Sequence, residues 1–152
     1  MRKRCMVDTT VLARVLIKKD RGLLDKLTNR YVLYVPINVM EEVFFQILVS
    51  VVGASIDRYK FYEVKEGWEK GIGKKEVSQT INSLISLIDF GILTALDINA
   101  EIFKHSIEMC KRYSLLPNDA LIAATCRFYG IRRIATFDDD FKRVKFLKVV
   151  EV

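Results

Sequence analysis

Carboxylates are the residues of this sequence whose positions could support chemistry. Asp8 lies in an otherwise apolar run, with Met6 and Val7 before it and Val11 shortly after it. A carboxylate is costly to desolvate, so Asp8 needs a polar partner, a metal ion or a capping role. One interpretation is that Asp8 caps a helix that begins near Thr10. The other is that Asp8 ends a buried strand and points into a site at the carboxyl edge of a sheet.

Three further acids stand at comparable places in the chain. Asp138 follows a predicted strand, whereas Glu42 and Asp119 lie in the first turns of predicted helices. Each acid has an ordinary explanation as a solvated helix residue, a partner of the helix dipole or part of an Asp-rich turn. In a parallel α/β sheet, however, residues that follow strands gather at one edge. Together the acids predict a pocket of four or five carboxylates.

Such a pocket indicates a divalent metal ion. Neighbouring carboxylates raise one another's pKa, and a bound cation relieves that repulsion. Ligands that are all oxygen favour Mg²⁺ or Mn²⁺ over zinc or copper. An incomplete protein shell leaves positions for water and phosphate oxygens, as in phosphodiester hydrolysis. The single histidine, His105, lies in an amphipathic helical pattern, so histidine triads and zinc sites have little support.

The composition is that of a folded, basic, globular protein. The chain has 152 residues, of which 51% are hydrophobic and 29% charged, which suits one domain with a sizeable core. Its net charge of +6 permits a polyanionic partner such as a nucleic-acid backbone. The three scattered cysteines are typical of reduced intracellular thiols. Asp8 interrupts any signal peptide, and the uncharged run 43–56 is short for a membrane span. We therefore expect a soluble, cytoplasmic protein.

Predicted strands alternate with predicted helices along the chain. We expect strands at about 4–7, 32–35, 92–94, 133–136 and 149–152, and helices at 11–18, 23–27, 39–52, 77–88, from 97 or 99 onward, and 119–129. Asn38 and Asn118 are expected as N-caps, Gly130 as a C′ residue, and Phe103, Ile107 and Cys110 on one helix face. This order predicts an α/β fold with a parallel sheet of four to five strands and helices on both faces.

The whole chain, 1–152, is expected to form a single domain. Residues 55–75 are predicted to be a helical and loop extension, because the stretch is too short for a core of its own. Tyr59, Phe61, Tyr62 and Trp68 lie in it. Such aromatic side chains could stack on unpaired bases, or belong to the core or to a protein interface.

Four stretches make the sequence resemble the PIN-domain nucleases, and specifically the VapC-type toxins of toxin–antitoxin pairs. They are Val7–Leu12, Val35–Val43, Leu115–Thr125 and Ile134–Phe141, and they occur in the family's order over nearly the whole chain. The Asp-Ala-Leu-Ile-Ala-Ala and Thr-x-Asp-x-Asp-Phe patterns within them are specific. The stretch around Glu42 is a weak signal by itself.

The resemblance implies a three-layer PIN-like fold and a set of site residues. Asp8, Glu42, Asp119 and Asp138 would be catalytic and would bind the metal, with Asp140 as a further ligand and Thr9 and Thr136 as auxiliary residues that orient ligands or water. Glu42 is preferred to Glu41 because Val43, Phe44 and Phe45 match the apolar residues that usually follow the family's glutamate. The implied activity is Mg²⁺- or Mn²⁺-dependent endoribonuclease cleavage of single-stranded or looped RNA. A homodimer and inhibition by a small antitoxin protein are implied as well.

Basic residues near the predicted acids are candidates for RNA binding. They are Arg14, Lys18 and Lys19 after the first acid, and Arg132, Arg133, Lys142, Arg143 and Lys145 around the last acids. For each of them a solvated surface position is an equal alternative.

Other functions remain open at this stage. PIN domains also occur in RNA-processing and structure-specific DNA nucleases, and an inactive PIN module could serve in binding alone. A phosphohydrolase of the haloacid-dehalogenase type would use Asp8 as a nucleophile, but it needs a second acid where this chain has Thr10. A phosphoacceptor module would need a lysine opposite its aspartates. Metal-dependent turnover would separate the nuclease from an inactive module.

Overall fold

The fold is built on a five-stranded parallel sheet. The computed structural model describes residues 1–152, and the strand order is β3-β2-β1-β4-β5. The strands are β1 (Lys3–Val7), β2 (Tyr31–Pro36), β3 (Leu93–Leu96), β4 (Arg133–Ala135) and β5 (Lys148–Val150). All four pairings are parallel, and the central strand β1 lies between β2 and β4. The predicted α/β class with a parallel sheet is confirmed.

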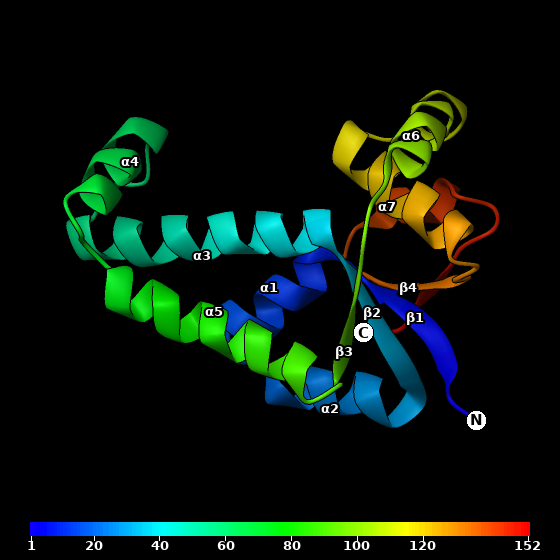
Figure 1. The fold of residues 1–152 in the computed structure, drawn as a ribbon, viewed down its shortest axis with the longest axis horizontal. Helices are drawn as coiled ribbons and strands as arrows, with labels where there is room; N and C mark the ends of the chain where they lie inside the picture. Colours follow the sequence, from blue (N-terminus) through cyan, green and yellow to red (C-terminus); the bar gives the residue numbers. More distant parts are fainter.

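Helices cover both faces of this sheet. They are α1 (Thr9–Ile17), α2 (Arg21–Arg30), α3 (Ile37–Ile56), α4 (Phe61–Glu69), α5 (Lys74–Asp89), α6 (Ala100–Tyr113) and α7 (Pro117–Phe128), with a 3-10 turn, η1 (Asp139–Arg143), before β5. Parallel strands are normally joined by right-handed crossovers, and the chain reverses its direction across the sheet after β3. The helices before β3 and the pair α6 and α7 therefore lie on opposite sides (Figure 1), which confirms the three-layer architecture.

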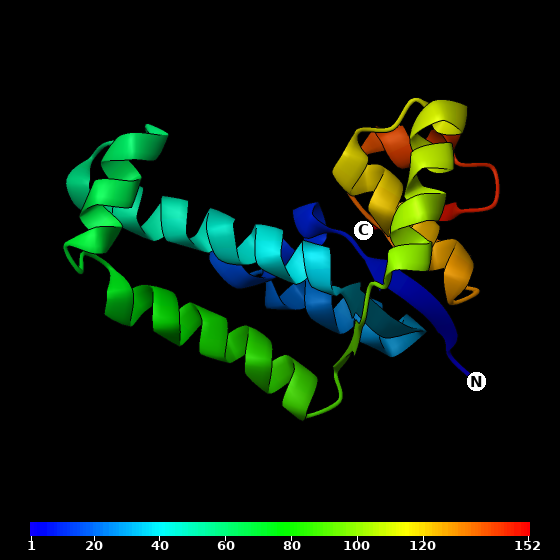
Figure 2. The same ribbon diagram turned by 45° about the horizontal axis from the view of Figure 1, so that its top comes forward.

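Helices α3 and α5 extend well beyond the sheet. The two run side by side, and α4 lies at the end of this arm, far from the N-terminus (Figures 1 and 2). Gly73 starts α5 with a φ of +73°, a backbone conformation that favours glycine. By length and composition α3 is the one helix that could cross a membrane, with 28% of its most apolar window buried. Val39, Val43 and Ile47 form its buried side against the core.

Helix α7 packs into the core through small side chains. Ala120, Ala123 and Ala124 are at most 1% exposed and belong to the hydrophobic core. This packing matters for the site because α7 also carries Asp119 in its first turn. A larger side chain at Ala123 would cost about 1–3 kcal/mol through overpacking and would displace Asp119.

Two predicted helix starts are wrong. Helix α3 begins at Ile37 with Pro36 at the N-cap position, and α7 begins at Pro117 with Leu116 at the N-cap position. Neither Asn38 nor Asn118 caps its helix, because the amide groups bond to each other instead. The predicted C′ position of Gly130 is confirmed, since it follows the C-cap of α7 with a φ of +65°.

Helix α6 carries apolar side chains on its exposed side as well as on the side that faces the core. Phe103 is 59% exposed and Ile107 is 45% exposed, whereas Ile102 and Met109 are buried. Asn99 caps the helix by accepting a hydrogen bond from the backbone N–H of Ile102. The periodicity of Phe103 and Ile107 is therefore helical, but it marks an apolar surface and not the core.

Candidate active site

Asp8 has both of the roles that the sequence suggested for it. It directly follows β1, and it caps α1 because its Oδ1 accepts a hydrogen bond of 2.6 Å from the N–H of Thr9. Its other oxygen, Oδ2, accepts bonds from the hydroxyls of Thr10 at 2.9 Å and Thr136 at 2.6 Å. The residue is only 3% exposed. Burial raises the pKa of Asp8, and the hydrogen bonds that it accepts act in the opposite direction.

The two threonines also attach the loop after β4 to α1. Thr136 Oγ1 accepts a bond of 2.9 Å from the N–H of Asp138, and Thr10 Oγ1 accepts one of 3.0 Å from the N–H of Phe137. Asp138 is thereby held at a fixed place relative to Asp8. Thr136 was expected at the site, whereas Thr10 was not, although its position two residues after Asp8 is a usable signal.

Glu42 is held by a polar chain of side chains from three helices. Its Oε2 accepts hydrogen bonds from Thr9 Oγ1 at 2.8 Å and from Asn118 Nδ2. Asn118 Oδ1 in turn accepts a bond of 2.8 Å from Asn38 Nδ2. Since a carboxylate only accepts, the two amides must be oriented in this direction. Glu41, by contrast, is exposed.

Asn38 and Asn118 are site residues that the sequence analysis missed. Both were assigned to helix caps, because Asn at the start of a helix normally has that role. Asn38 Oδ1 is the one buried side-chain polar atom of the structure without a hydrogen-bond partner. The amide nitrogen of Asn38 therefore orients Asn118, while the amide oxygen of Asn38 accepts no hydrogen bond.

Asp119, Asp138 and Asp140 form a tight cluster. Each offers a carboxylate oxygen, and these atoms all lie within 4.8 Å of one another. The pKa of Asp119 is raised to about 6, first by burial and then by the charges of Asp8, Asp138, Glu42 and Asp140. The other four carboxylates named from the sequence therefore lie around Asp119.

The donor atoms suit a hard divalent cation. Asp119, Asp138 and Asp140 present only oxygen, and Asp8 and Glu42 border them with carboxylates that the protein already orients. Oxygen ligands of this kind fit Mg²⁺ or Mn²⁺. Hydrogen bonds to ligating carboxylates are the usual way in which such sites are kept in shape. The raised pKa of Asp119 is the electrostatic cost that a bound cation would remove.

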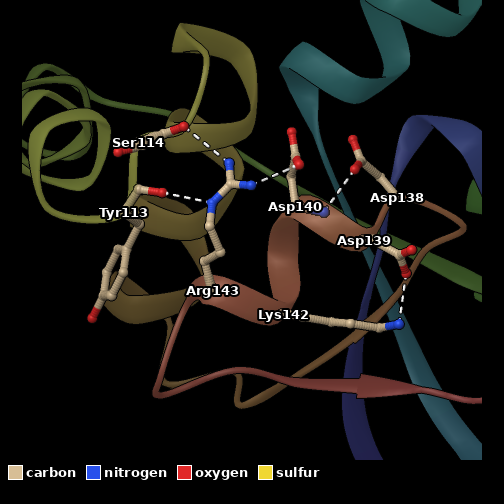
Figure 3. A network of polar contacts seen from close by, with 7 residues as sticks. All are labelled: Tyr113, Ser114, Asp138, Asp139, Asp140, Lys142 and Arg143. Carbon is tan, nitrogen blue, oxygen red and sulfur yellow. Dashed lines mark hydrogen bonds and ion pairs between the residues drawn. The ribbon is translucent and has the colours of Figure 1, made fainter.

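Two of the basic residues named for RNA binding are engaged within the protein (Figure 3). Arg143 donates to the carbonyls of Tyr113 and Ser114, both at 2.9 Å, and to Asp140 Oδ1 at 2.8 Å. Lys142 pairs with Asp139 at 2.6 Å. Arg143 thus joins the end of α6 to the acidic turn η1, which is a structural role.

Arg14, Lys18 and Arg133 lie in two different places. Arg14 and Lys18 line a cavity of about 710 Å³ between α1 and α3, together with Thr10. The Arg14 guanidinium pairs with Asp20 at 3.0 Å and lies over the Phe137 ring at 5.1 Å. Arg133 begins β4, so it stands at the opposite end of that strand from the acids.

Comparison with known proteins identifies a family for this chain and two relatives in it. The family model described as "PIN domain" matches residues 5–147. A curated relative from Methanocaldococcus jannaschii, ribonuclease VapC2, is 38% identical over 134 residues, which cover 87% of this chain and 81% of the relative. Ribonuclease VapC6 from the same organism is 33% identical over 150 residues and 95% of both chains.

Solved structures show the same fold at low sequence identity. VapBC2 from Rickettsia felis, bound to a DNA fragment from the promoter, matches with a TM-score of 0.64, 16% identity, and coverage of 95% of this chain and 96% of that one. VapC20 from Mycobacterium tuberculosis, described as a sarcin–ricin loop cleaving toxin, matches with a TM-score of 0.61, 16% identity, and coverage of 94% and 96%.

Proposed function

Because this chain belongs to the PIN-domain family and resembles two of its VapC ribonucleases in sequence, we propose that it is a metal-dependent endoribonuclease. Asp8, Glu42, Asp119 and Asp138 are its catalytic residues. The observation that carries the proposal is the convergence of four other carboxylates around Asp119. A cluster of this kind would otherwise cost stability, so a function that uses its charge accounts for it.

Each residue of the site has its own role in the proposed reaction. Asp119, Asp138 and Asp140 would hold Mg²⁺ or Mn²⁺, with Asp8 and Glu42 beside them, and the ion would activate water and stabilise charge on a phosphodiester. Thr9 and Asn118 fix the orientation of Glu42, and Thr10 and Thr136 fix that of Asp8. Positioning of this kind is a large part of catalysis at metal sites.

Arg14 and Lys18 support RNA as the substrate. They line a cavity that reaches Thr10, and Thr10 bonds directly to Asp8. A strand lying along α1 would meet cations before it reached the acids, which suits a phosphate backbone. Both residues are exposed, and Lys18 forms no ion pair, whereas Arg14 pairs with Asp20, which lines the same cavity.

We also propose that the protein is the toxin of a toxin–antitoxin pair, acts as a cytoplasmic homodimer and is inhibited by a small antitoxin protein. A solved structure from Klebsiella pneumoniae is described as a toxin–antitoxin complex, and VapC20 from Mycobacterium tuberculosis is described as a toxin. The exposed apolar side chains Phe103 and Ile107 on α6, and Phe45 and Phe61 on the arm, are of the kind that protein interfaces cover. Light scattering should give twice the 17.6 kDa of one chain.

The test of the nuclease activity is cleavage of a mixed pool of structured RNAs by the purified protein. The reactions contain Mg²⁺, Mn²⁺ or a chelator, and Asp8→Asn and Asp119→Asn are run beside the wild type. We expect cutting with either ion and loss of at least about 100-fold in each variant, since both remove a carboxylate of the cluster. Asp139→Asn is the matched control, because Asp139 is exposed and pairs only with Lys142.

The alternatives predict different results in the same experiment. Cutting of structured DNA in place of RNA would assign the site to the structure-specific DNA nucleases of the family. RNA binding without cutting under any ion would indicate an inactive binding module. Activity that survives both Asp8→Asn and Asp119→Asn would show that the carboxylate cluster is not the active site.

A further inference from the structure

A second basic cavity lies at the opposite edge of the sheet from the carboxylates. It has a volume of about 500 Å³ and is lined by the turn between α7 and β4 and by the segment before β5. Its lining residues are Cys126, Arg127, Gly130, Ile131, Arg132, Lys145 and Phe146. These two connections lie on the same side of the molecule, in orange and red in Figure 1. None of the proposed active-site residues belongs to this set.

The cations of this cavity are not neutralised within the protein. Arg127, Arg132 and Lys145 are exposed, and none of them forms an ion pair. No acidic side chain lines the cavity. The guanidinium of Arg127 lies over the ring of Phe146 at 5.1 Å, which limits the conformations that its side chain adopts. Three positive charges are thus gathered around one hollow without a counter-charge.

Backbone donors are available at the same place. The N–H groups of Arg132, Lys145 and Phe146 donate to no acceptor within the protein. By contrast, Ile131 and Lys148 on either side of them donate to Cys126 and Arg132 carbonyls at 2.8 and 2.9 Å. Free backbone N–H groups in a concave turn, together with Arg and Lys side chains, are the usual donors to a phosphate.

We propose that this cavity is a phosphate-binding site distinct from the carboxylate site. Its ligand is a phosphate group, and the favoured source is the backbone of an RNA strand that extends past the active site. Strand β4 joins the two places, because the cavity lies before its first residue and Asp138 follows its end. The six residue steps from Arg132 to Asp138, at about 3.3 Å each, place the two sites at most about 20 Å apart along the chain, a distance that a bound single strand of several nucleotides covers.

The RNA source rests on the proposed nuclease function, whereas phosphate binding by the cavity does not. The experiment therefore measures binding and not cleavage, in the Asp119→Asn background. The test variant adds Arg132→Ala and Lys145→Ala, which leave the contact between Arg127 and Phe146 in place.

The matched control adds Lys75→Ala and Lys104→Ala, which remove the same charge from two exposed lysines without ion pairs or side-chain hydrogen bonds. Affinity for a labelled single-stranded RNA of about 16 nucleotides is measured at several salt concentrations. In parallel, inorganic phosphate is titrated while the NMR amide signals of Arg132, Lys145 and Phe146 are followed.

We expect the RNA affinity to fall about tenfold in the test variant and less than about twofold in the control, with a smaller salt dependence in the test variant. Unchanged RNA affinity with saturable shifts of the three amides by inorganic phosphate would keep the site and assign it to a free phosphate. Equal RNA affinities of test and control variants, with no saturable amide shift, would overturn the proposal. Each of these results stands whether or not the wild type cuts RNA.

Discussion

Asp8 and Asp119 occupy the same pocket in different surroundings. Asp8 is almost fully buried and accepts three hydrogen bonds that support its charge. Asp119 is half-buried, has no hydrogen-bond donor to its carboxylate, and faces four other acids. Its pKa of about 6 follows from that difference. The protein therefore keeps Asp8 in place by itself, whereas Asp119 gains most from a bound cation.

This difference predicts how Asp119→Asn affects stability without metal. Asp119 has a raised pKa in the folded state, so between its ordinary value and about 6 the folded protein binds more protons. Protonation of Asp119 therefore stabilises the folded protein, and this stabilisation is lost as the pH rises through that window. Asparagine cannot ionise, so the variant should gain about 1 kcal/mol at neutral pH after allowance for solvent screening, and little in acid. Urea unfolding with chelator at both pH values measures this.

Asp139→Asn is the control for this stability effect. Its side chain is 85% exposed, so its stability should stay within about 0.5 kcal/mol of the wild type. A gain of the same size in both variants would show that the gain does not come from the burial of Asp119 and the charges around it.

The amide chain of Asn38 and Asn118 leads to a prediction about Glu42. Asn118→Ala removes a donor to Glu42, so the carboxylate turns more freely. We expect a kcat about 10- to 100-fold lower and weaker Mn²⁺ binding, as for other residues that orient a metal ligand. Asn38→Ala acts one bond further away and should have a smaller effect. Unchanged kcat and unchanged Mn²⁺ affinity in Asn118→Ala would remove Asn118 from the site.

At the scale of elements, the acidic turn η1 depends on α6. Arg143 spans the two, since it donates to the last carbonyls of α6 and to Asp140 on η1. Cations at a helix C-terminus stabilise it by bonding its free carbonyls. Asp138 caps η1 by accepting a bond of 2.8 Å from the N–H of Asp140. Asp138 and Asp140 therefore supply carboxylates to the site and also form hydrogen bonds that stabilise η1.

Arg143→Ala and Lys142→Ala should separate a structural cation from a surface cation. Arg143→Ala loses charge-assisted bonds to two carbonyls and leaves Asp140 unpaired, so we expect a loss of about 2 kcal/mol. Lys142→Ala breaks one exposed ion pair and should cost less than about 0.5 kcal/mol. Chemical denaturation measures both. If the two variants lose the same stability, the bonds from Arg143 to α6 contribute nothing.

At the scale of the whole molecule, the strand order brings distant residues together. Strand β1 has neighbours on both sides, and the chain changes direction across the sheet next to it. The ends of β1 and β4 therefore meet at one edge, which is where ligands of open α/β sheets bind. The proposed phosphate cavity lies at the other edge, so the carboxylate cluster and the basic cavity lie at opposite ends of β4.

Metal binding should stabilise the whole fold, since the carboxylates come from β1, α3, α7 and η1. An ion that binds only the folded protein at about 100 times its Kd adds about 2.7 kcal/mol. We expect Mn²⁺ to raise the Tm by several degrees, chelator to reverse the rise, and Asp119→Asn to abolish most of it. Differential scanning calorimetry follows this effect. An equal rise in wild type and variant would place the ion elsewhere.

Local patterns in the sequence determined much of this protein. The alternation of strands and helices and the parallel sheet follow from hydrophobic periodicity and from capping residues such as Asp8 and Gly130. The four acid-bearing stretches indicated a common pocket, because residues after parallel strands converge. These features depend on neighbours along the chain, so they are readable without coordinates.

Only the tertiary structure decided which polar partner each side chain has. Asn38 and Asn118 look like helix caps in sequence, yet they bond across 80 residues and orient Glu42. Arg143 looks like an RNA ligand, yet it is engaged with α6. A hydrogen bond needs two groups within about 3 Å, and that distance is set by the packing of α3, α7 and η1 against the sheet. For such pairs the local sequence supplies the donor, and the fold selects the acceptor.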